Sequence, residues 1–362
     1  MTISARIAVL LPGTEKLEIK EAELPDPGPH QVIIKQFASG VCHSQLHQIH
    51  RPRTEAVVLG HESTGVVEAV GSAVTHVAAG DRVLVTWVPR EIRADYRAPE
   101  RAQLEFADGT SAVSQNVFTW ASHTIADEQY VVKMPEGTPL DFGSIIGCAV
   151  MTGAGAVIHS ANVQPGQSVA VWGVGGVGLS AIAAARNVGA DPIIAVDLDA
   201  EKLAMARRFG ATLTVNAAEG DAVAGVRALT PGDRPGDPGG VDWAFDCIGK
   251  SVTTQQILGA ARFGHTAMTR GGTAVLVGVP TEPVTISSVE LLLGEKKLLG
   301  SLGGSCSPDV DFPLFVQWYQ QGKFELDQLV TTRYGLDDIN QACIDLAGGH
   351  IAGRAILELN EA

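Results

Sequence analysis

The chain has 362 residues and a formal net charge of −14, with 45% hydrophobic and 18% charged residues. That balance is typical of a globular protein, and the length allows two domains of roughly 100–200 residues each. The acidic charge argues against a nucleic-acid partner, because phosphate binding needs a concentrated basic surface.

Location and redox state follow from two further features. The first residues lack the basic segment and the apolar stretch of a signal peptide. The apolar runs are far shorter than the roughly 18 residues that span a bilayer, so we expect a cytoplasmic protein without a membrane partner. In that reducing compartment, the five cysteines are expected to be metal ligands and buried thiols rather than disulfides.

The first 150 residues alternate short β-like runs with Gly and Pro. This spacing predicts a compact, antiparallel, barrel-like domain whose loops carry the chemistry. The predicted strands are residues 6–11, 31–40, 63–70 and 82–87.

From about residue 150 the pattern changes to strands that alternate with helices, which predicts a doubly wound parallel sheet and an α/β fold class. Strands are expected at 168–172, 192–196, 243–247 and 273–277, and helices at 176–188 and 200–209. Residues 231–240 are too rich in Pro and Gly for regular structure and are expected to form a surface loop.

Three residues from distant segments have the donor types of a catalytic zinc site: Cys42, His61 and Cys148. Zinc favours a tetrahedron of thiolate and imidazole ligands, and catalytic sites keep only three protein ligands so that the fourth position stays open. One such residue alone would be a buried thiol or an ordinary histidine. Their combination predicts one catalytic zinc.

A glycine-rich loop follows the strand expected at 168–172 and opens a helix, which is the context that a dinucleotide-binding motif requires. The first glycine allows the tight turn, the second lets the pyrophosphate approach, and the third allows the helix to pack closely on the strand. The free N–H groups of the helix N-terminus would bind the phosphates. The loop comprises Gly173, Val174, Gly175, Gly176, Val177 and Gly178.

Asp197 ends the next predicted strand. A carboxylate there accepts hydrogen bonds from the ribose hydroxyls of NAD and repels the 2′-phosphate of NADP. No basic residue follows it immediately, because Leu198 and Asp199 come next. NAD is therefore the expected cofactor.

Together these motifs resemble the zinc-dependent alcohol dehydrogenase branch of the medium-chain dehydrogenase/reductase superfamily. The resemblance covers nearly the whole chain. Its motifs are Gly60-His61-Glu62-Ser63-Thr64-Gly65, Gly71, Val74, Gly80-Asp81-Arg82-Val83, Cys148, the glycine loop, Val277-Gly278-Val279-Pro280 and Gly353-Arg354.

The resemblance implies a GroES-like β-barrel catalytic domain at residues 1–150 and a Rossmann NAD-binding domain at 151–302. It also implies that residues 303–362 return to the first domain, with a helix at 312–321 and a closing strand at 354–359. It further implies a homodimer or homotetramer.

For catalysis, the resemblance implies a proton relay from Ser44 through the cofactor ribose to His47, whereas in isolation these would be a turn serine and a surface histidine. Glu62 is expected to be an acid beside the zinc ligands, and transient ligation of zinc is its alternative role. Trp87 and Trp120 are candidates for the wall of a substrate pocket, with core packing as the competing explanation.

The same resemblance assigns contacts with the cofactor to residues beyond the glycine loop and Asp197. Lys202 would contact the ribose, or else be a solvated lysine on a helix surface. The other expected contacts are His43 with the pyrophosphate, Thr152 with the nicotinamide, Arg354 with a phosphate, and Val277 and Val279 in their motif.

The chain departs from its relatives at two places. Gln45 stands where relatives usually have an acidic residue, so the side chain can still hydrogen-bond the liganding imidazole, but without negative charge. No cysteine lies between Arg82 and Gly147, where many relatives hold a structural zinc with four cysteines. One zinc per chain is therefore expected, with residues 90–118 held by ordinary packing.

The leading interpretation is a zinc- and NAD-dependent enzyme that interconverts primary or secondary alcohols, including aromatic or medium-chain ones, with aldehydes or ketones. A second is a reductase of C=C or C=N bonds on the same scaffold, for which the Ser44 and His47 relay would be unnecessary. A third, from another class, is a non-catalytic nucleotide-binding paralogue, which the three zinc ligands argue against.

Overall fold

In a computed structural model, residues 3–91, 97–265 and 268–361 are described. The chain forms two compact units. Unit 1 comprises Met1–Cys148, Ser307–Gln321 and Leu326–Ala362, and unit 2 comprises Ala149–Cys306 and Gly322–Glu325. Across the described residues, none of the helices has the length and apolar character that crossing a membrane requires.

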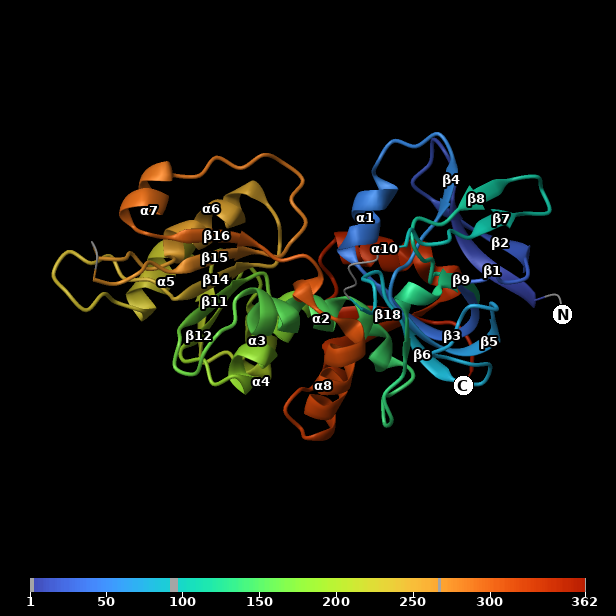
Figure 1. Cartoon of the computed structure of the whole chain (residues 1–362). Coiled ribbons are helices and arrows are strands. Elements are labelled where there is room, and N and C mark those ends of the chain that lie inside the picture. Colours follow the sequence, from blue (N-terminus) through green and yellow to red (C-terminus); the bar gives the residue numbers. More distant parts are fainter. Residues whose placement is uncertain (1–2, 92–96, 266–267, 362) are drawn as a thin grey trace. The chain divides into compact units, whose positions relative to one another are not determined.

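Unit 1 is built mainly from two sheets (Figure 1). The first has the order β2-β1-β4-β8-β7. Its strands are β1 (Ile3–Leu10), β2 (Leu17–Leu24), β4 (Ala56–Val58), β7 (Gln103–Glu105) and β8 (Ser111–Val113).

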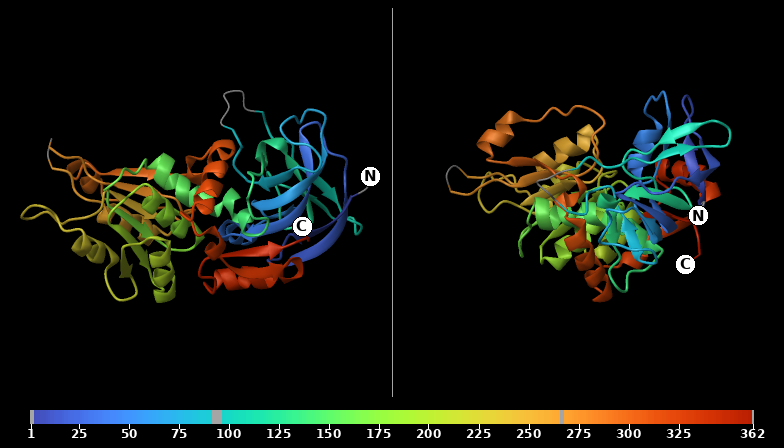
Figure 2. Two further views of the ribbon diagram at one scale, coloured as in Figure 1. Left: turned by 90° about the horizontal axis from the view of Figure 1, so that it is seen from below. Right: turned by 45° about the vertical axis from the view of Figure 1, so that its right-hand side comes forward.

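The second sheet has the order β10-β6-β5-β3-β18-β17, and β9 also pairs with β3. β3 and β18 are antiparallel (Figure 2), so the C-terminal segment completes a sheet that the N-terminal residues begin. The strands are β3 (Gln31–Val41), β5 (Ser63–Val70), β6 (Arg82–Val85), β9 (His123–Asp127), β10 (Val131–Lys133), β17 (Val330–Gly335) and β18 (Arg354–Glu358).

Four α-helices and a 3-10 helix of unit 1 bear on the site and the core. Apolar residues of α1 and α10 pack with residues of β1, β3 and β18 in one core cluster. The helices are α1 (His43–Ile49), the 3-10 helix η2 (Phe142–Gly147), α8 (Pro308–Gln320), α9 (Leu326–Leu329) and α10 (Ile339–Ala347).

The segment at 90–118 is held by ordinary packing in its described part, and residues 92–96 of it lie outside the described residues. Leu104 and Phe106 are buried in the core cluster that also contains Ile7 and Phe118. Strands β7 and β8 pair antiparallel with each other.

Unit 2 contains a parallel sheet with the order β13-β12-β11-β14-β15-β16, which confirms the doubly wound prediction (Figure 1). The order reverses beside β11, where ligand-binding crevices form in such sheets. The strands are β11 (Val169–Trp172), β12 (Ile193–Asp197), β13 (Leu213–Asn216), β14 (Trp243–Asp246), β15 (Thr273–Leu276) and β16 (Lys297–Gly300).

Helices connect these parallel strands, as a parallel sheet requires. Residues 200–209 form α4 with the predicted bounds, because Asp199 caps its N-terminus and Gly210 ends it at φ 119°. The helices of the unit are α2 (Ala149–Gly155), which continues as a π-helix (Ala156–Ser160), α3 (Gly176–Asn187), α4 (Ala200–Phe209), α5 (Ala222–Leu229), α6 (Ser251–Ala260) and α7 (Ser288–Leu293). Residues 231–240 form an irregular loop, as predicted.

Candidate metal and cofactor sites

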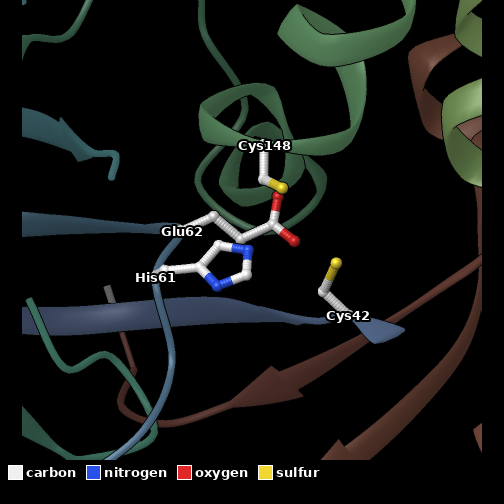
Figure 3. Close-up of side chains that lie close together, drawn as sticks. All are labelled: Cys42, His61, Glu62 and Cys148. Atoms are coloured by element: carbon white, nitrogen blue, oxygen red, sulfur yellow. The ribbon is translucent and has the colours of Figure 1, made fainter. Parts of the chain in front are cut away.

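The three predicted zinc ligands meet in unit 1 together with Glu62 (Figure 3). One donor atom from each of Cys42, His61, Glu62 and Cys148 lies within 4.8 Å of the others. Cys42 follows β3, His61 and Glu62 precede β5, and Cys148 follows η2. Segments that are distant in sequence therefore converge on one cluster.

Glycines bring these segments close enough to meet. Gly60 has φ 96°, and a Cβ there would lie 2.5 Å from the backbone nitrogen of Trp120. A Cβ at Gly40 would lie 2.2 Å from Oε1 of Glu62. Gly147, the residue before Cys148, approaches β6 so closely that a Cβ would lie 2.5 Å from the Val85 carbonyl. Larger residues at these positions would displace the ligand segments.

The donor set fits a zinc ion with three protein ligands. Nε2 of His61 is buried and has no hydrogen-bond partner among the described residues, so its lone pair is available to a metal. Two sulfurs and one imidazole nitrogen are ligands that zinc prefers. Glu62 is already engaged by the guanidinium of Arg354, which leaves a fourth position for another ligand.

The pKa values of the two cysteines are shifted in opposite directions. The hydrogen bond with Cys148 lowers the pKa of Cys42 well below its usual value, and nearby Arg354 and His61 add to this effect. The same hydrogen bond, together with burial, raises the pKa of Cys148 well above its usual value. Cys42 is therefore the more acidic thiol of the pair, and a metal bound to both cysteines would require both to be deprotonated.

The pairing of Glu62 with Arg354 was not predicted. Both side chains are buried, and the guanidinium of Arg354 donates a hydrogen bond to Oε1 of Glu62. Burial alone would lower the pKa of Arg354. The negative charges of Glu62, Cys42 and Cys148 outweigh burial and hold this pKa above its usual value. Because 292 residues separate Glu62 and Arg354, no local pattern could reveal the pair. The expected phosphate contact of Arg354 stays a prediction.

Gln45 contacts the predicted ligand His61, as expected from its position. Its amide Nε2 faces Nδ1 of His61, and only 1% of the residue is exposed. Trp87 also lies near this imidazole, with ring centroids 6.3 Å apart in an edge-to-face arrangement. Trp87 is half-buried, so it borders the cluster.

The residues of the expected proton relay lie on α1, which begins directly after Cys42. Oγ of Ser44 is 3.5 Å from Sγ of Cys42. His47 is three residues further along, and this spacing puts both side chains on the same side of the helix. Both are half-buried, whereas His43, the expected pyrophosphate contact, is exposed.

Trp120 is a correction to the sequence analysis. Its side chain is fully buried in the core cluster that contains Leu46 and Leu357, and its indole N–H donates to the Gly40 carbonyl. A fully buried and hydrogen-bonded indole has no surface to offer a substrate. Core packing, the competing explanation, therefore accounts for Trp120.

In unit 2 the glycine loop joins β11 to α3, and each glycine has a distinct environment. Gly173 has φ 82°, which favours glycine, and a Cβ at Gly178 would lie 2.0 Å from the Gly173 carbonyl. A Cβ at Gly175 would meet no atom within 4 Å. The loop is therefore closed on its inner side at Gly178 and open at Gly175, where a ligand can approach. Gly176 and Val177 begin α3, whose first N–H groups lack helical partners.

Asp197 is held against this loop. Its Oδ2 accepts a hydrogen bond of 2.9 Å from the backbone N–H of Val174, and its Oδ1 accepts from the N–H groups of Leu198 and Asp199. The carboxylate therefore joins the end of β12 to the loop. This contact fits the expected role of Asp197 beside a bound nucleotide.

The remaining expected cofactor contacts also lie in unit 2. Thr152 is in α2, and its buried hydroxyl has no hydrogen-bond partner among the described residues. Val277 follows β15, where its N–H donates to the Asp246 carbonyl, and Val279 is exposed. Lys202 is half-buried on α4. Their contacts with a cofactor stay predictions.

Comparison with known proteins supports the fold that is assigned to each unit. The alcohol dehydrogenase GroES-like domain matches residues 28–136, and the zinc-binding dehydrogenase domain matches residues 176–321. These matches confirm the GroES-like and Rossmann fold assignments.

Similar proteins cover nearly the whole chain. Putative alcohol dehydrogenase D of Mycobacterium tuberculosis is 32% identical over 94% of this chain and 96% of its own length. The crystal structure of an alcohol dehydrogenase zinc-binding domain protein from Burkholderia ambifaria matches with TM-score 0.87 and 33% identity over 100% of both chains. Benzyl alcohol dehydrogenase from Acinetobacter calcoaceticus matches with TM-score 0.85 and 31% identity over 99% of this chain and 100% of that chain.

The motifs, the two folds and these matches have one explanation. The chain belongs to the zinc-type alcohol dehydrogenases of the medium-chain dehydrogenase superfamily, and it is an alcohol/aldehyde oxidoreductase.

Proposed function

We propose that this protein interconverts primary or secondary alcohols with aldehydes or ketones, using one zinc ion per chain and NAD. The observation that carries the proposal is the buried cluster of Cys42, His61 and Cys148, whose donor atoms lie within 4.8 Å of one another. Its donor set matches that of three-ligand catalytic zinc sites.

Each side chain in the cluster has a part in holding and activating the reactants. Zinc held by Cys42, His61 and Cys148 would act as a Lewis acid on the substrate oxygen, and NAD would accept the hydride. The Arg354 guanidinium, which is buried against Glu62, supplies positive charge beside the two thiolates. It thereby stabilises the deprotonated form of both cysteines.

Ser44 is the residue that would take up the alcohol proton. Its hydroxyl lies 3.5 Å from Sγ of Cys42, so it stands next to a predicted ligand. His47, further along the same side of α1, is half-buried and would pass the proton to solvent. An imidazole suits this step because its ring nitrogens can both accept and donate a proton.

NAD rather than NADP follows from Asp197. The carboxylate is fixed against the loop by its bond with Val174, so it cannot turn away from a 2′-phosphate without losing that bond. Close approach of two negative charges opposes binding. The proposed cofactor is therefore NAD.

An apolar or aromatic alcohol is the proposed substrate class. Trp87 is half-buried and lies edge-to-face against His61, so its ring can bound the space beside the metal. Aromatic walls favour apolar ligands. The benzyl alcohol dehydrogenase that is 31% identical to this chain acts on an aromatic alcohol by its name.

The test combines metal analysis with kinetics. Purified protein should contain one zinc per chain and should oxidise a panel of aliphatic and aromatic alcohols with NAD. Ser44→Ala should lower kcat/KM by about 10²–10⁴-fold, which is the usual contribution of general acid–base catalysis, while zinc content and NADH affinity stay near wild type.

His47→Gln should have a milder effect that is largest at low pH, where a base is most needed to draw the proton away. Two tightly bound zinc ions per chain would contradict the single-site proposal. Full alcohol oxidation by Ser44→Ala would remove the relay and favour C=C or C=N reduction instead.

A further inference from the structure

A second group of metal-ligating side chains lies in unit 2, apart from the cluster that holds the proposed zinc. One donor atom from each of Asp233, Asp237 and His265 lies within 4.8 Å of the others. The two aspartates belong to the loop between α5 and β14, and His265 follows α6 (Figure 1). The group therefore precedes the parallel strands β14 and β15, whereas the glycine loop follows β11, at the other end of the strands.

A tight turn holds Asp237 in place. Its N–H donates to the carbonyl three residues earlier, and the two residues between them are Pro235 and Gly236, of which Gly236 has φ 86°. Proline followed by a glycine with positive φ is typical of a type II turn. Oδ1 of Asp237 then accepts a hydrogen bond of 2.9 Å from the Gly239 N–H. The turn and this bond fix the carboxylate, so that its other oxygen has a defined direction.

That other oxygen approaches His265 as two ligands of one ion would. Nε2 of His265 is 3.5 Å from Oδ2 of Asp237, which is longer than an ordinary N–H···O hydrogen bond. Nε2 is buried and has no hydrogen-bond partner among the described residues. Two donors that each lie about 2.1 Å from a common metal ion are about 3.0–3.4 Å apart. The separation therefore fits a shared ion better than a direct bond.

A cavity of about 190 Å³ adjoins the three side chains. A water molecule needs only about 10–15 Å³ of such space, so an ion with further water ligands has room. Asp233 is 77% exposed and lies 3.4 Å from Arg234, a pair of the exposed kind that contributes about 0–1 kcal/mol. Arg262 also lines the cavity, but its guanidinium donates to Asp242 at 2.7 Å. These cations therefore leave the carboxylates available to a metal.

We propose that Asp233, Asp237 and His265 form a second metal site, which binds an exchangeable divalent transition-metal ion such as Mn²⁺. The ion joins the loop at 231–240 to the segment after α6. Carboxylates suit Mn²⁺ and imidazole suits transition metals, whereas Mg²⁺ and Ca²⁺ prefer sites made of oxygen ligands. Because Asp233 is exposed, the ion should leave on dialysis, which is consistent with a single tightly bound zinc.

The test titrates the purified protein with Mn²⁺ and counts the free ion by electron paramagnetic resonance. Wild type should bind one Mn²⁺ per chain without losing zinc, because zinc binds thiolates in preference to Mn²⁺. Asp237→Asn and His265→Gln should each weaken Mn²⁺ binding at least tenfold, since even a residue that only supports a ligand typically contributes about 10–100-fold. NADH affinity should stay at the wild-type value, because the site lies at the other end of the strands.

His350→Gln is the matched control. Nδ1 of His350 lies 3.7 Å from Asp345, and this pair has no third donor close enough to form a metal-ligating group among the described residues. The variant should bind Mn²⁺ as wild type does. If Asp237→Asn or His265→Gln does not fold, Asp233→Asn decides, because an exposed side chain is rarely needed for folding. It should bind Mn²⁺ more weakly than wild type.

Three results would overturn the proposal. The first is wild-type protein that binds no Mn²⁺. The second is equal Mn²⁺ binding by wild type and the folded site variants, which would identify an adventitious ion only. The third is displacement of Mn²⁺ by an equal concentration of Ca²⁺, which would show that the imidazole is not a ligand. Failure of the proposed function is seen separately, as missing zinc or missing alcohol oxidation, and it changes none of these comparisons.

Discussion

The metal cluster and the glycine loop achieve binding in opposite ways. The loop is one contiguous segment that uses backbone N–H groups and the space left by missing side chains, as at Gly175. The cluster is assembled from side chains of distant segments, and it buries two thiols with the ion pair of Glu62 and Arg354. The loop offers a ligand the backbone N–H groups at the start of α3, which lack helical partners, whereas the cluster offers side-chain atoms such as Nε2 of His61, which has no partner among the described residues.

This difference predicts different responses to mutation. Substitutions in the cluster should change stability through buried charge, because its charged groups lie beside groups of opposite charge. Substitutions in the loop should change stability through steric fit, because a new Cβ that lies too close to another atom prevents the loop from keeping its conformation. Three experiments test whether charge governs the cluster and shape governs the loop.

The largest effect is expected from breaking the buried ion pair. Arg354→Met removes the cation that is buried against the Glu62 carboxylate, and removing one partner of a buried ion pair typically costs about 3–5 kcal/mol. The double variant Arg354→Met/Glu62→Met removes both charges and should be closer to wild type. Urea unfolding of the metal-free proteins, monitored by circular dichroism, gives the unfolding midpoint of each variant.

The control for that series is an exposed ion pair. Arg6 bonds to Asp337 with both side chains well exposed, so Arg6→Met should shift the midpoint little, because exposed pairs contribute about 0–1 kcal/mol. A double variant of the buried pair that is less stable than Arg354→Met alone would show that charge balance is not what the pair provides.

An intermediate effect is expected in the loop, where two alanine substitutions should separate stability from binding. Gly178→Ala places a Cβ 2.0 Å from the Gly173 carbonyl, and such overpacking typically costs about 1–3 kcal/mol or more. Gly175→Ala meets no protein atom within 4 Å, so unfolding should change little while NADH affinity falls. Thermal unfolding and NADH fluorescence titration measure the two effects. Equal loss of stability in both variants would contradict this assignment.

The same contrast explains how much the sequence could predict. The glycine loop and α4 were predicted closely because their signals are local: glycine spacing, an Asp cap and a terminal glycine. The convergence of the predicted ligands Cys42, His61 and Cys148 was also predicted, because the three lie in short recognisable motifs.

Other features of the site depend on tertiary contacts. The partnership of Arg354 with Glu62 joins residues 292 positions apart, so no periodicity records it. Trp120 was expected in a pocket as well as in the core, because an aromatic residue near a binding motif fits both. Only its burial and its bond to the Gly40 carbonyl decide for the core.

The smallest effect concerns Asp197, a charged side chain that contacts the loop. Asp197 acts both through backbone contact and through charge, because it holds Val174 through a hydrogen bond and carries the negative charge that is proposed to select NAD. Asp197→Asn removes the charge and places an amide NH₂ against one backbone N–H donor. NAD should bind less tightly, and the preference for NAD over NADP should narrow by about tenfold, or about 1.4 kcal/mol.

Asp199→Asn is the matched control for Asp197→Asn, because it removes the same charge two residues away. Asp199 caps α4 by accepting from the N–H groups of Glu201 and Lys202, and asparagine is an equally good cap. The ratio of kcat/KM for NAD and NADP should therefore stay near wild type in Asp199→Asn. If both variants narrow the preference equally, the general negative potential of this region sets cofactor choice. If only Asp197→Asn does so, the carboxylate that is fixed against Val174 sets it, and its charge acts only because the loop holds it in place.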